Sequence, residues 1–391
     1  MGRAGPSAVP PGGDGKGRLG HLPLPALTTT PTGPGGGGDE VSATPGSATG
    51  AGVLLPDHVG SAPARSRRRS GVVAAYAVTM FVLVTVNFAL PPTLPGDPVD
   101  ALVDTGSPTR LQDEALRAQL EEHYGLDRPV AEQYRRYLGD LVRGDLGVSI
   151  RYRVPVGDLL AERLPWTLLL VATSVSVAVG VGWLAGIHSA WRRGRPADRG
   201  LLVVFLALNS LPVFFFVASA ALFVLSVKLG WFPLAGARTP FLDDAGVASR
   251  VGDVVHHLAL PAAVLAASFV TSQYLNMRAG MVGELGADHL LVGRAKGLPE
   301  RWVKYRYAAR NALLPAVTLT AVHVSFAVTA SILVETVFAY QGVGRLIFEA
   351  VAYRDYPTLQ ACFLVLSVVV VTANLLADAL YRRLDPRTDA P

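Results

Sequence analysis

Six long runs without a charged side chain divide the chain beyond residue 70. They cover residues 71–90, 165–190, 201–227, 258–277, 312–334 and 357–377. A helix needs roughly 20 consecutive apolar residues to cross the hydrocarbon core of a bilayer, whereas a buried strand needs only about 4–8. Prolines inside the runs, such as Pro212 and Pro261, are tolerated in membrane helices because neighbouring helices satisfy the freed backbone groups. The pattern predicts an all-α membrane protein, a bundle of six transmembrane helices.

The composition favours a membrane protein over a soluble one. Of the 391 residues, 50% are hydrophobic and only 17% are charged, whereas soluble domains average about 25% charged residues. The net charge of +5 sits in short blocks beside the apolar runs, which favours membrane orientation over nucleic-acid binding. The single cysteine, Cys362, lies inside the sixth run and excludes a disulfide framework within the chain.

Residues 1–70 differ from the rest in being rich in Gly, Pro, Ala, Ser and Thr. Such a segment buries too little apolar surface to offset the entropy lost on ordering. We therefore expect a disordered cytoplasmic tail, followed by a membrane domain over residues 71–388. The first apolar run begins only at Gly71, too late for a secretory signal.

Basic residues in the short loops predict the orientation of the helices. A block of four arginines ends at Arg69, just before the first run. The loops 191–200 and 278–311 hold four and seven basic residues, whereas the loops 228–257 and 335–356 hold three and two. Because short cytoplasmic loops carry the excess of Lys and Arg, we expect both termini in the cytoplasm.

The loop 91–164 is expected to lie outside and to form a helical subdomain. Its apolar residues recur at helical spacing in residues 111–124 and 130–142, separated by Gly125 and Pro129. The loop holds nine basic residues, but loops longer than about 60 residues largely escape the orientation rule. The residues leave open whether this subdomain is a lid on the bundle or a docking site for a partner.

The loop 278–311 has the pattern of a helix, a Gly-Leu-Pro turn and a second helix. Leu290, Leu291 and Ala295 share one side of the first helix, and Pro299 suits the first position of the second. Apolar surface on the second helix comes from Trp302, Val303, Tyr305 and Tyr307. The pattern alone is equally compatible with an interfacial amphipathic hairpin that merely connects two spans.

Motifs across residues 71–388 resemble one family of membrane proteins. Gly293-Arg-Ala-Lys-Gly-Leu298, followed by Ala309-Arg-Asn-Ala-Leu-Leu-Pro315, resembles the coupling loop in the membrane subunits of binding-protein-dependent ABC importers. The resemblance is closest to the dipeptide/oligopeptide/nickel permease family. Further matching motifs, in the family's order, are Pro95-Gly-Asp-Pro98, Gly125-Leu-Asp-Arg-Pro129, Gly144-Asp-Leu-Gly147, Val334-Glu-Thr-Val-Phe338 with Gly342-Val-Gly-Arg345, Arg354-Asp-Tyr-Pro357 and Asn374-Leu-Leu-Ala-Asp378.

The resemblance implies that the cytoplasmic loop docks into a groove on a separate ATPase subunit. The residues of this coupling loop would be Gly293, Arg294, Ala295, Lys296, Gly297, Leu298, Pro299, Arg310, Asn311 and Pro315. The sequence departs from the family at three positions: Gly293 replaces the usual Ala, Val292 a small polar residue, and Tyr307 a His. None of these departures removes the glycine at the turn.

The same resemblance implies a set of partners. They are a second homologous permease subunit, forming a heterodimer or homodimer, two ATP-binding cassette ATPase subunits and an extracytoplasmic solute-binding protein. The phosphate-binding pattern G-x-x-x-x-G-K-[ST] occurs nowhere in the sequence. ATP and Mg would therefore be bound by the partner subunits, and we expect no cofactor in this chain.

Polar residues within the runs are candidates for a translocation path, because they are costly in lipid and tend to face the bundle interior or a cavity. The candidates are Asn209, Ser210, Gln273, Thr318, Thr320 and His323. Hydrogen bonding between helices is the alternative role for each. Candidates for an outer gate are Glu335, Arg345, Arg354 and Asp355, with Glu335 pairing with one of the two arginines for gating or for simple anchoring.

Together these features predict a transport subunit of the cell (inner/plasma) membrane that moves dipeptides, oligopeptides or similar solutes inward. Nickel or another solute of the same family remains an alternative. The patterns His-Glu-x-x-His and Gly-x-Ser-x-Gly are absent, which argues against a hydrolase. A secondary transporter would need ionisable residues deep in the runs, which contain only His188 and His323.

Overall fold

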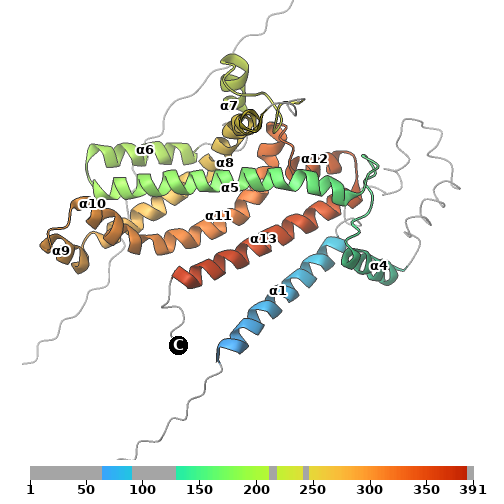
Figure 1. Ribbon diagram of the computed structural model, residues 1–391, viewed down its shortest axis with the longest axis horizontal. Helices are drawn as coiled ribbons and strands as arrows, with labels where there is room; N and C mark the ends of the chain where they lie inside the picture. Colours follow the sequence, from blue (N-terminus) through green and yellow to red (C-terminus); the bar gives the residue numbers. More distant parts are fainter. Residues whose placement is uncertain (1–63, 90–128, 211–217, 241–245, 385–391) are drawn as a thin grey trace, which may run out of the picture. The chain divides into compact units, whose positions relative to one another are not determined.

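Helices make up most of the described chain (Figure 1). The computed structural model describes residues 64–89, 129–210, 218–240 and 246–384, with side chains described between residues 74 and 376 of these ranges. In chain order the helices are α1 Ala64–Ala89, α4 Val130–Arg143, α5 Val156–Trp191, α6 Pro196–Ser210, α7 Ala218–Ala221, the π-helix η4 Leu222–Lys228, α8 Val247–Glu284, α9 Asp288–Ala295, α10 Glu300–Trp302, the π-helix η5 Val303–Ala308, α11 Ala309–Val337, α12 Val343–Ala352 and α13 Tyr356–Leu384. Within the described ranges the extended structure is limited to an antiparallel bridge between Val148 and Pro155. The predicted all-α fold is confirmed.

Four helical stretches are long and apolar enough to cross a membrane. They are Val156–Trp191, Val247–Glu284, Glu300–Val337 and Tyr356–Leu376. These stretches contain the second, fourth and fifth predicted runs and all but the last residue of the sixth, and the first run falls on α1. The long helices exceed the predicted runs because charged and polar residues extend them beyond the apolar segment at one or both ends.

The third predicted run, residues 201–227, falls on α6, α7 and the π-helix η4. The first, α6, ends at Ser210, and α7 begins at Ala218. The stretch between them lies outside the described residues, as do nearly all of the predicted tail 1–70 and the predicted helix 111–124. The second predicted helix of the long loop is present as α4.

The helices α5 and α8 pack against each other through a stripe of small residues. Ala178, Gly182, Gly186 and Ala190 follow one another at intervals of four on α5, and all are buried. A Cβ at position 182 would lie 2.7 Å from Gln273 Cβ, and one at position 186 would lie 2.8 Å from the Tyr274 carbonyl oxygen. Only glycine permits this approach of the two backbones, as at small-residue contacts in other membrane helices.

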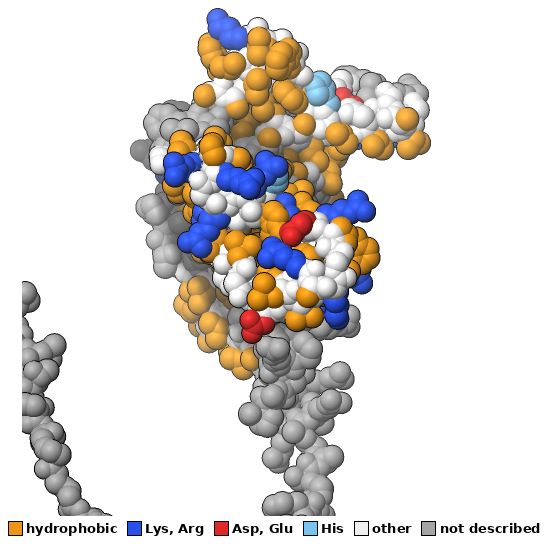
Figure 2. Space-filling model, turned by 90° about the vertical axis from the view of Figure 1, so that its left-hand side faces the viewer, with side chains coloured by type: hydrophobic (Ala, Val, Ile, Leu, Met, Phe, Trp, Pro, Cys, Tyr) orange, Lys and Arg blue, Asp and Glu red, His pale blue; other side chains and the backbone are white. Residues whose placement is uncertain are grey.

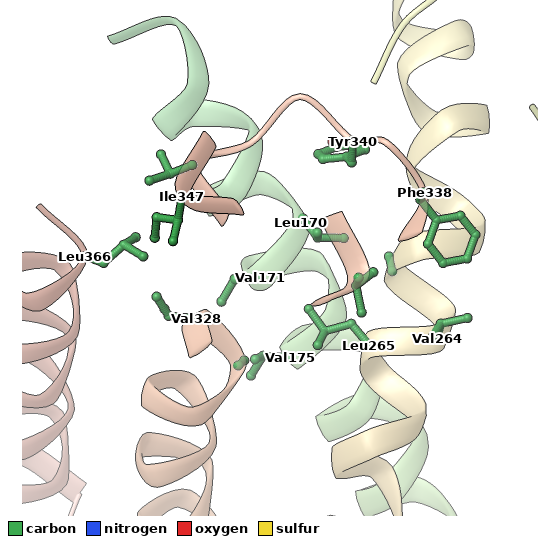
Figure 3. Close-up of a cluster of buried hydrophobic side chains, with 14 of the residues drawn as sticks. Leu170, Val171, Val175, Val264, Leu265, Val328, Phe338, Tyr340, Ile347 and Leu366 are labelled. Carbon is green, nitrogen blue, oxygen red and sulfur yellow. The ribbon is translucent and has the colours of Figure 1, made fainter. Parts of the chain in front are cut away.

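Two clusters of buried hydrophobic side chains hold the bundle together. The larger joins α5, α6, α7, α8, α11, α12 and α13, and Figure 3 shows its Leu170, Leu265, Val328, Ile347 and Leu366. The smaller, which we call the hairpin core, joins one end of α5, α8 and α11 to the segment between α8 and α11. Its buried members are Ile187, Ala190, Met277, Met281, Leu290, Val303, Ala308, Ala309, Ala312 and Ala316.

Candidate functional site

The segment between α8 and α11 folds into a helical hairpin, residues 288–308, built from α9, α10 and η5. Leu298 N–H donates to the Gly293 carbonyl at 3.3 Å, and Gly297 N–H donates to the Arg294 carbonyl at 2.9 Å. These are the two hydrogen bonds of a Schellman motif, which ends a helix with a left-handed residue. Gly297 is that residue, with φ of 71°. The predicted helix, turn and helix are present, although Pro299 lies one residue before α10 rather than at its first position.

The two helices of the hairpin divide their apolar residues between two faces. Leu290 and Val303 point into the hairpin core and are at most 1% exposed. The sequence pattern placed Leu291 on the same side as Leu290, but its side chain is 60% exposed. Val292, Trp302 and Tyr305 are exposed as well, and we call these three and Leu291 the outward face of the hairpin. The hairpin therefore buries one face in its own protein and presents a second apolar face outward.

Exposed basic side chains outnumber acidic ones around this outward apolar face, where Asp288 and Glu300 are also exposed. Figure 2, which views the end of the molecule where α9 and α10 lie, shows Lys and Arg side chains interspersed with hydrophobic ones. Arg294 Nε lies 3.1 Å from Glu300 Oε1, and the Arg306 guanidinium lies 5.5 Å from the centre of the Trp302 ring. Lys296 and Arg310, two of the predicted coupling residues, are exposed. An apolar surface with a basic rim suits docking into a groove of complementary charge.

Hydrogen bonds close the base of the hairpin. Asn311 Nδ2 lies 3.2 Å from Glu284 Oε2 and 3.4 Å from His289 Nε2, so α11 is tied to the end of α8 and the start of α9. His289 Nε2 also lies 3.3 Å from the Glu284 carboxylate. The structure thus brings Asn311 to the hairpin, whereas Pro315 lies farther along α11 and lines an open hollow with Asn276 and Thr318.

Sequence reasoning missed a buried ion pair beside the hairpin. Arg278 donates to the Asp198 carboxylate through Nε at 2.8 Å and Nη2 at 3.0 Å. Ser189 Oγ and the Gly194 N–H also donate to Asp198, which is 3% exposed. The Arg278 hydrogen bonds hold the pKa of Asp198 well below its usual value, despite burial. Asp198 has four arginines near it in the sequence, so the pattern predicted an exposed charge in a solvated loop.

Three of the six predicted path residues meet in one polar network between α5, α8 and α11. Gln273 Nε2 lies 3.0 Å from both Thr320 Oγ1 and His323 Nδ1, and Trp183 Nε1 donates to Gln273 Oε1 at 3.0 Å. Ser272 Oγ lies 3.1 Å from His323 Nε2. Gln273 is fully buried. These contacts join α5, α8 and α11, which is the alternative role given above for such residues, hydrogen bonding between helices.

The other three predicted path residues do not join this network. Asn209 and Ser210 are exposed at the end of α6, and Ser210 Oγ donates to the Leu206 carbonyl. Thr318 is exposed on α11 and donates to the Leu314 carbonyl at 3.3 Å. No described hydrogen bond joins these three residues to the network, and their role in a path stays a prediction.

Comparison with known proteins decides the family. Residues 178–390 match the family described as binding-protein-dependent transport system inner membrane component. A putative peptide permease of Brucella ovis is 38% identical over 319 residues, covering 81% of this chain and 95% of the relative. The chain belongs to this family. Two further relatives are the oligopeptide transport system permease protein AppB of Bacillus subtilis, 36% identical over 78% of this chain and 94% of its own, and the glutathione transport system permease protein GsiC of Escherichia coli, 35% identical over 79% and 94%.

This inner membrane component is a multi-pass transport protein. The structure gives a role to two of its motifs, Val334-Glu-Thr-Val-Phe338 and Gly342-Val-Gly-Arg345, which lie at the end of α11 and the start of α12. Glu335 is fully buried where α11 meets the start of α12, and it accepts the Arg345 N–H at 3.1 Å. A Cβ at position 342 would overlap the Glu335 carboxylate, and one at position 344 would lie 2.6 Å from Ile332 Cα. The two glycines of Gly342-Val-Gly-Arg345 therefore let the first turn of α12 close over the glutamate.

Glu335 does not pair with an arginine side chain in the way the sequence suggested. The Arg345 guanidinium instead donates to Glu349 Oε1 at 2.9 Å and to the Ala339 carbonyl at 2.6 Å. Tyr152 Oη donates to the other oxygen of Glu349 at 2.6 Å. Burial raises the pKa of Glu349, but these hydrogen bonds outweigh it and hold the pKa below its usual value.

Asp355 joins two motifs of the permease that lie far apart in the sequence. It accepts hydrogen bonds from Ser149 Oγ and the Arg151 N–H, so the segment after Gly144-Asp-Leu-Gly147 packs on the start of α13. Its other oxygen accepts the Thr358 N–H, as an N-cap residue does. Arg354, the fourth candidate gate residue, is exposed and has a left-handed φ of 53°.

Proposed function

We propose that this protein is the membrane-spanning permease subunit of an ATP-binding cassette importer for peptides. It would receive dipeptides or oligopeptides from an extracytoplasmic binding protein and pass them to the cytoplasm. ATP hydrolysis in two separate ATPase subunits would drive the transport, with ATP and Mg bound by those subunits. The absence of a phosphate-binding pattern from the sequence supports this division of labour.

The observation that carries the proposal is the outward face of the hairpin. Leu291, Val292, Trp302 and Tyr305 expose apolar surface at the junction of α8 and α11, and the exposed charged residues around them are mostly basic. Apolar surface of this kind is costly in water, and a partner that covers it would remove that cost. A partner that pushes on the hairpin would displace α8 and α11 together, since Asn311 joins the hairpin to both.

The names of the relatives support a peptide as substrate. They are described as permeases for peptides, oligopeptides and glutathione, which is itself a tripeptide. Nickel stays the alternative within the resemblance. The residues Asn209, Ser210, Gln273, Thr318, Thr320 and His323 remain proposals for the path, and Glu335, Arg345, Arg354 and Asp355 for the outer gate.

The proposed assembly places both termini in the cytoplasm and the hairpin on the cytoplasmic face. A second homologous permease subunit, or a second copy of this chain, would complete the path. The counts of basic residues in the short loops support this orientation, because the loop that contains the hairpin holds seven of them.

Gly297→Asp tests the role of the hairpin. A residue with a Cβ costs roughly 1–2 kcal/mol in the left-handed conformation, and a charged side chain would also obstruct docking. We expect the variant to reach the membrane in normal amount, to lose the co-purifying ATPase subunits and to lose uptake of labelled trialanine. Lys296→Glu, on the rim, is the matched control and should weaken docking less.

Uptake of trialanine, glutathione and nickel by cells that carry the complete transporter separates the substrates. Competition between trialanine and glutathione, without competition from nickel, is the expected result. If Gly297→Asp keeps full ATPase association and full uptake, the hairpin is only a connector and the proposed mechanism is wrong.

A further inference from the structure

The ion pair between Asp198 and Arg278 stands next to the hairpin but belongs to neither the hairpin nor its core. Arg278 lies on α8, six residues before the helix ends at Glu284 and the chain turns into the hairpin. Asp198 lies in the first turn of α6, just after the short elbow, residues 192–195, that joins α5 to α6. The pair therefore connects α8, which leads into the hairpin, to α6, which contributes no residue to the hairpin core.

The pair is built as a fixed junction rather than a surface contact. Both guanidinium hydrogen bonds reach the carboxylate, at 2.8 Å and 3.0 Å, and Asp198 is 3% exposed. Ser189 Oγ lies within hydrogen-bond distance of Asp198, of Arg278 Nε and of Tyr274 Oη. Three helices, α5, α6 and α8, thus converge on one buried carboxylate. Bidentate arginine pairs of this kind fix orientation as well as supplying energy.

Away from this junction, α6 packs on the larger hydrophobic cluster. Phe205 is buried in that cluster, and Leu201, Leu202 and Leu208 pack against it. Between α6 and α8 the structure also has the Thr271 Oγ1 hydrogen bond to the Phe205 carbonyl and the stacked rings of Phe205 and Tyr274. These contacts lie a turn or more farther along α6, toward Ser210. At the start of α6, the carboxylate and the elbow N–H of Gly194 are the described polar links to α8 and α5.

We propose that the Asp198–Arg278 pair is a positioning element that transmits displacement of the hairpin to α6. When a partner moves the hairpin, α8 moves with it, and the pair makes the start of α6 follow rather than slide. This inference rests on the proposed function, because it assigns a route to the movement that the ATPase subunits would impose. Without the pair, the hairpin and α8 would move while α6 lags behind.

A role in folding alone predicts a different outcome from a role in transmission. Removing one partner leaves a buried uncompensated charge, which is destabilising, whereas replacing both partners by neutral groups is often tolerated. Asp198→Asn combined with Arg278→Gln removes both charges and keeps side chains of similar shape. If the pair serves only stability, the double variant should behave like the wild type.

The experiment uses the complete transporter, with its second permease, ATPase subunits and binding protein, in proteoliposomes. It measures ATP hydrolysis and trialanine uptake for the wild type, Asp198→Asn, Arg278→Lys and the double variant. We expect the double variant to assemble and to hydrolyse ATP, with trialanine transported per ATP falling at least about fivefold, the lower end of typical coupling effects. Ser176→Ala, an exposed position on α5 whose hydroxyl bonds only to the Ala172 carbonyl of its own helix, is the matched control and should stay near the wild type.

Wild-type coupling in the double variant would overturn the proposal, and so would wild-type coupling in Asp198→Asn. If Asp198→Asn fails to assemble, Arg278→Lys provides the test instead, because Lys keeps the charge and loses the bidentate geometry. If none of the three variants assembles, the pair is a folding element and the proposal is wrong. If the wild type shows no ATP-dependent uptake at all, the proposed function itself fails, which is a distinguishable result.

Discussion

At the scale of single residues, the hairpin contains two glycines with opposite requirements. Gly297 needs the conformational freedom of glycine, because its φ is 71°. Gly293 lies within α9, where glycine has no such advantage. A Cβ at position 293 would meet Val303 Cγ2 at 3.7 Å and Leu298 Cδ1 at 4.0 Å, both ordinary contacts. The departure from the family at this position is therefore one that the fold does not demand.

Gly293→Ala should stabilise the protein by about 0.5–1 kcal/mol, because alanine loses less conformational entropy in a helix. Thermal unfolding of the purified protein in detergent measures the change. Gly297→Ala is the matched control and should be destabilised by roughly 1–2 kcal/mol. A destabilised Gly293→Ala would show that the contacts around α9 are tighter than the structure indicates.

Asp198 predicts a particular dependence on pH. Its pKa is lowered in the folded protein, chiefly by Arg278, so the stability that it contributes is present above the unfolded pKa of about 3.9 and is lost as pH falls below it. The difference in unfolding free energy between the wild type and Asp198→Asn should stay constant from about pH 5 to 8 and should narrow below about pH 4. A difference that changes between pH 6 and 8 would contradict this assignment.

At the scale of helices and turns, the sequence predicted what local patterning controls. The turn at Gly297 follows from residues within a few positions of one another, and the long apolar runs need only their own length to be recognised. The helix α12 was not predicted, because the apolar segment Val343–Ala352 is too short to cross a membrane and was counted within the loop 335–356. Its burial depends on α5, α11 and α13. The partners of Glu335 were unpredictable for the same reason, since the relevant donor is a backbone N–H at the start of α12.

The start of α13 offers a test at this scale. Asp355 caps the helix through the Thr358 N–H and also accepts a hydrogen bond from Ser149. Asp355→Ala should cost about 1–2 kcal/mol through loss of the cap, with a further loss from the buried Ser149 hydroxyl left without its acceptor. Asp355→Asn, a residue that caps helices equally well, should cost less. Equal losses of unfolding free energy in the two variants would show that capping contributes little.

At the scale of the whole molecule, orientation remains a prediction that rests on loop charges. Val142 on α4 is 89% exposed, and Arg193 is exposed in the elbow. Cysteines at these two positions should label differently in intact cells, with Val142→Cys reacting with an impermeant thiol reagent and Arg193→Cys reacting only after permeabilisation. The native Cys362 is fully buried and should give little background. The reverse labelling pattern would invert the proposed orientation.

The candidate site could be predicted only in part for a related reason. The resemblance identified the hairpin, but the ion pair of Asp198 and Arg278 joins residues eighty positions apart. Such pairing depends on the close approach of α5 and α8, which the glycines at positions 182 and 186 allow. The periodicity of the sequence predicts these helices, but it does not show which face of one helix packs against the other.

The hairpin core also has a consequence for how the protein is made. Its members on α5 and α8, Ile187, Met277 and Met281, precede the hairpin in the chain and leave the ribosome first. The turn itself closes through hydrogen bonds between residues at most five positions apart. We therefore expect the hairpin to fold during translation onto a surface already in place, before α11 is inserted. A nascent chain whose hairpin has left the ribosome, while α11 is still inside the exit tunnel, would carry a docking face that is already formed.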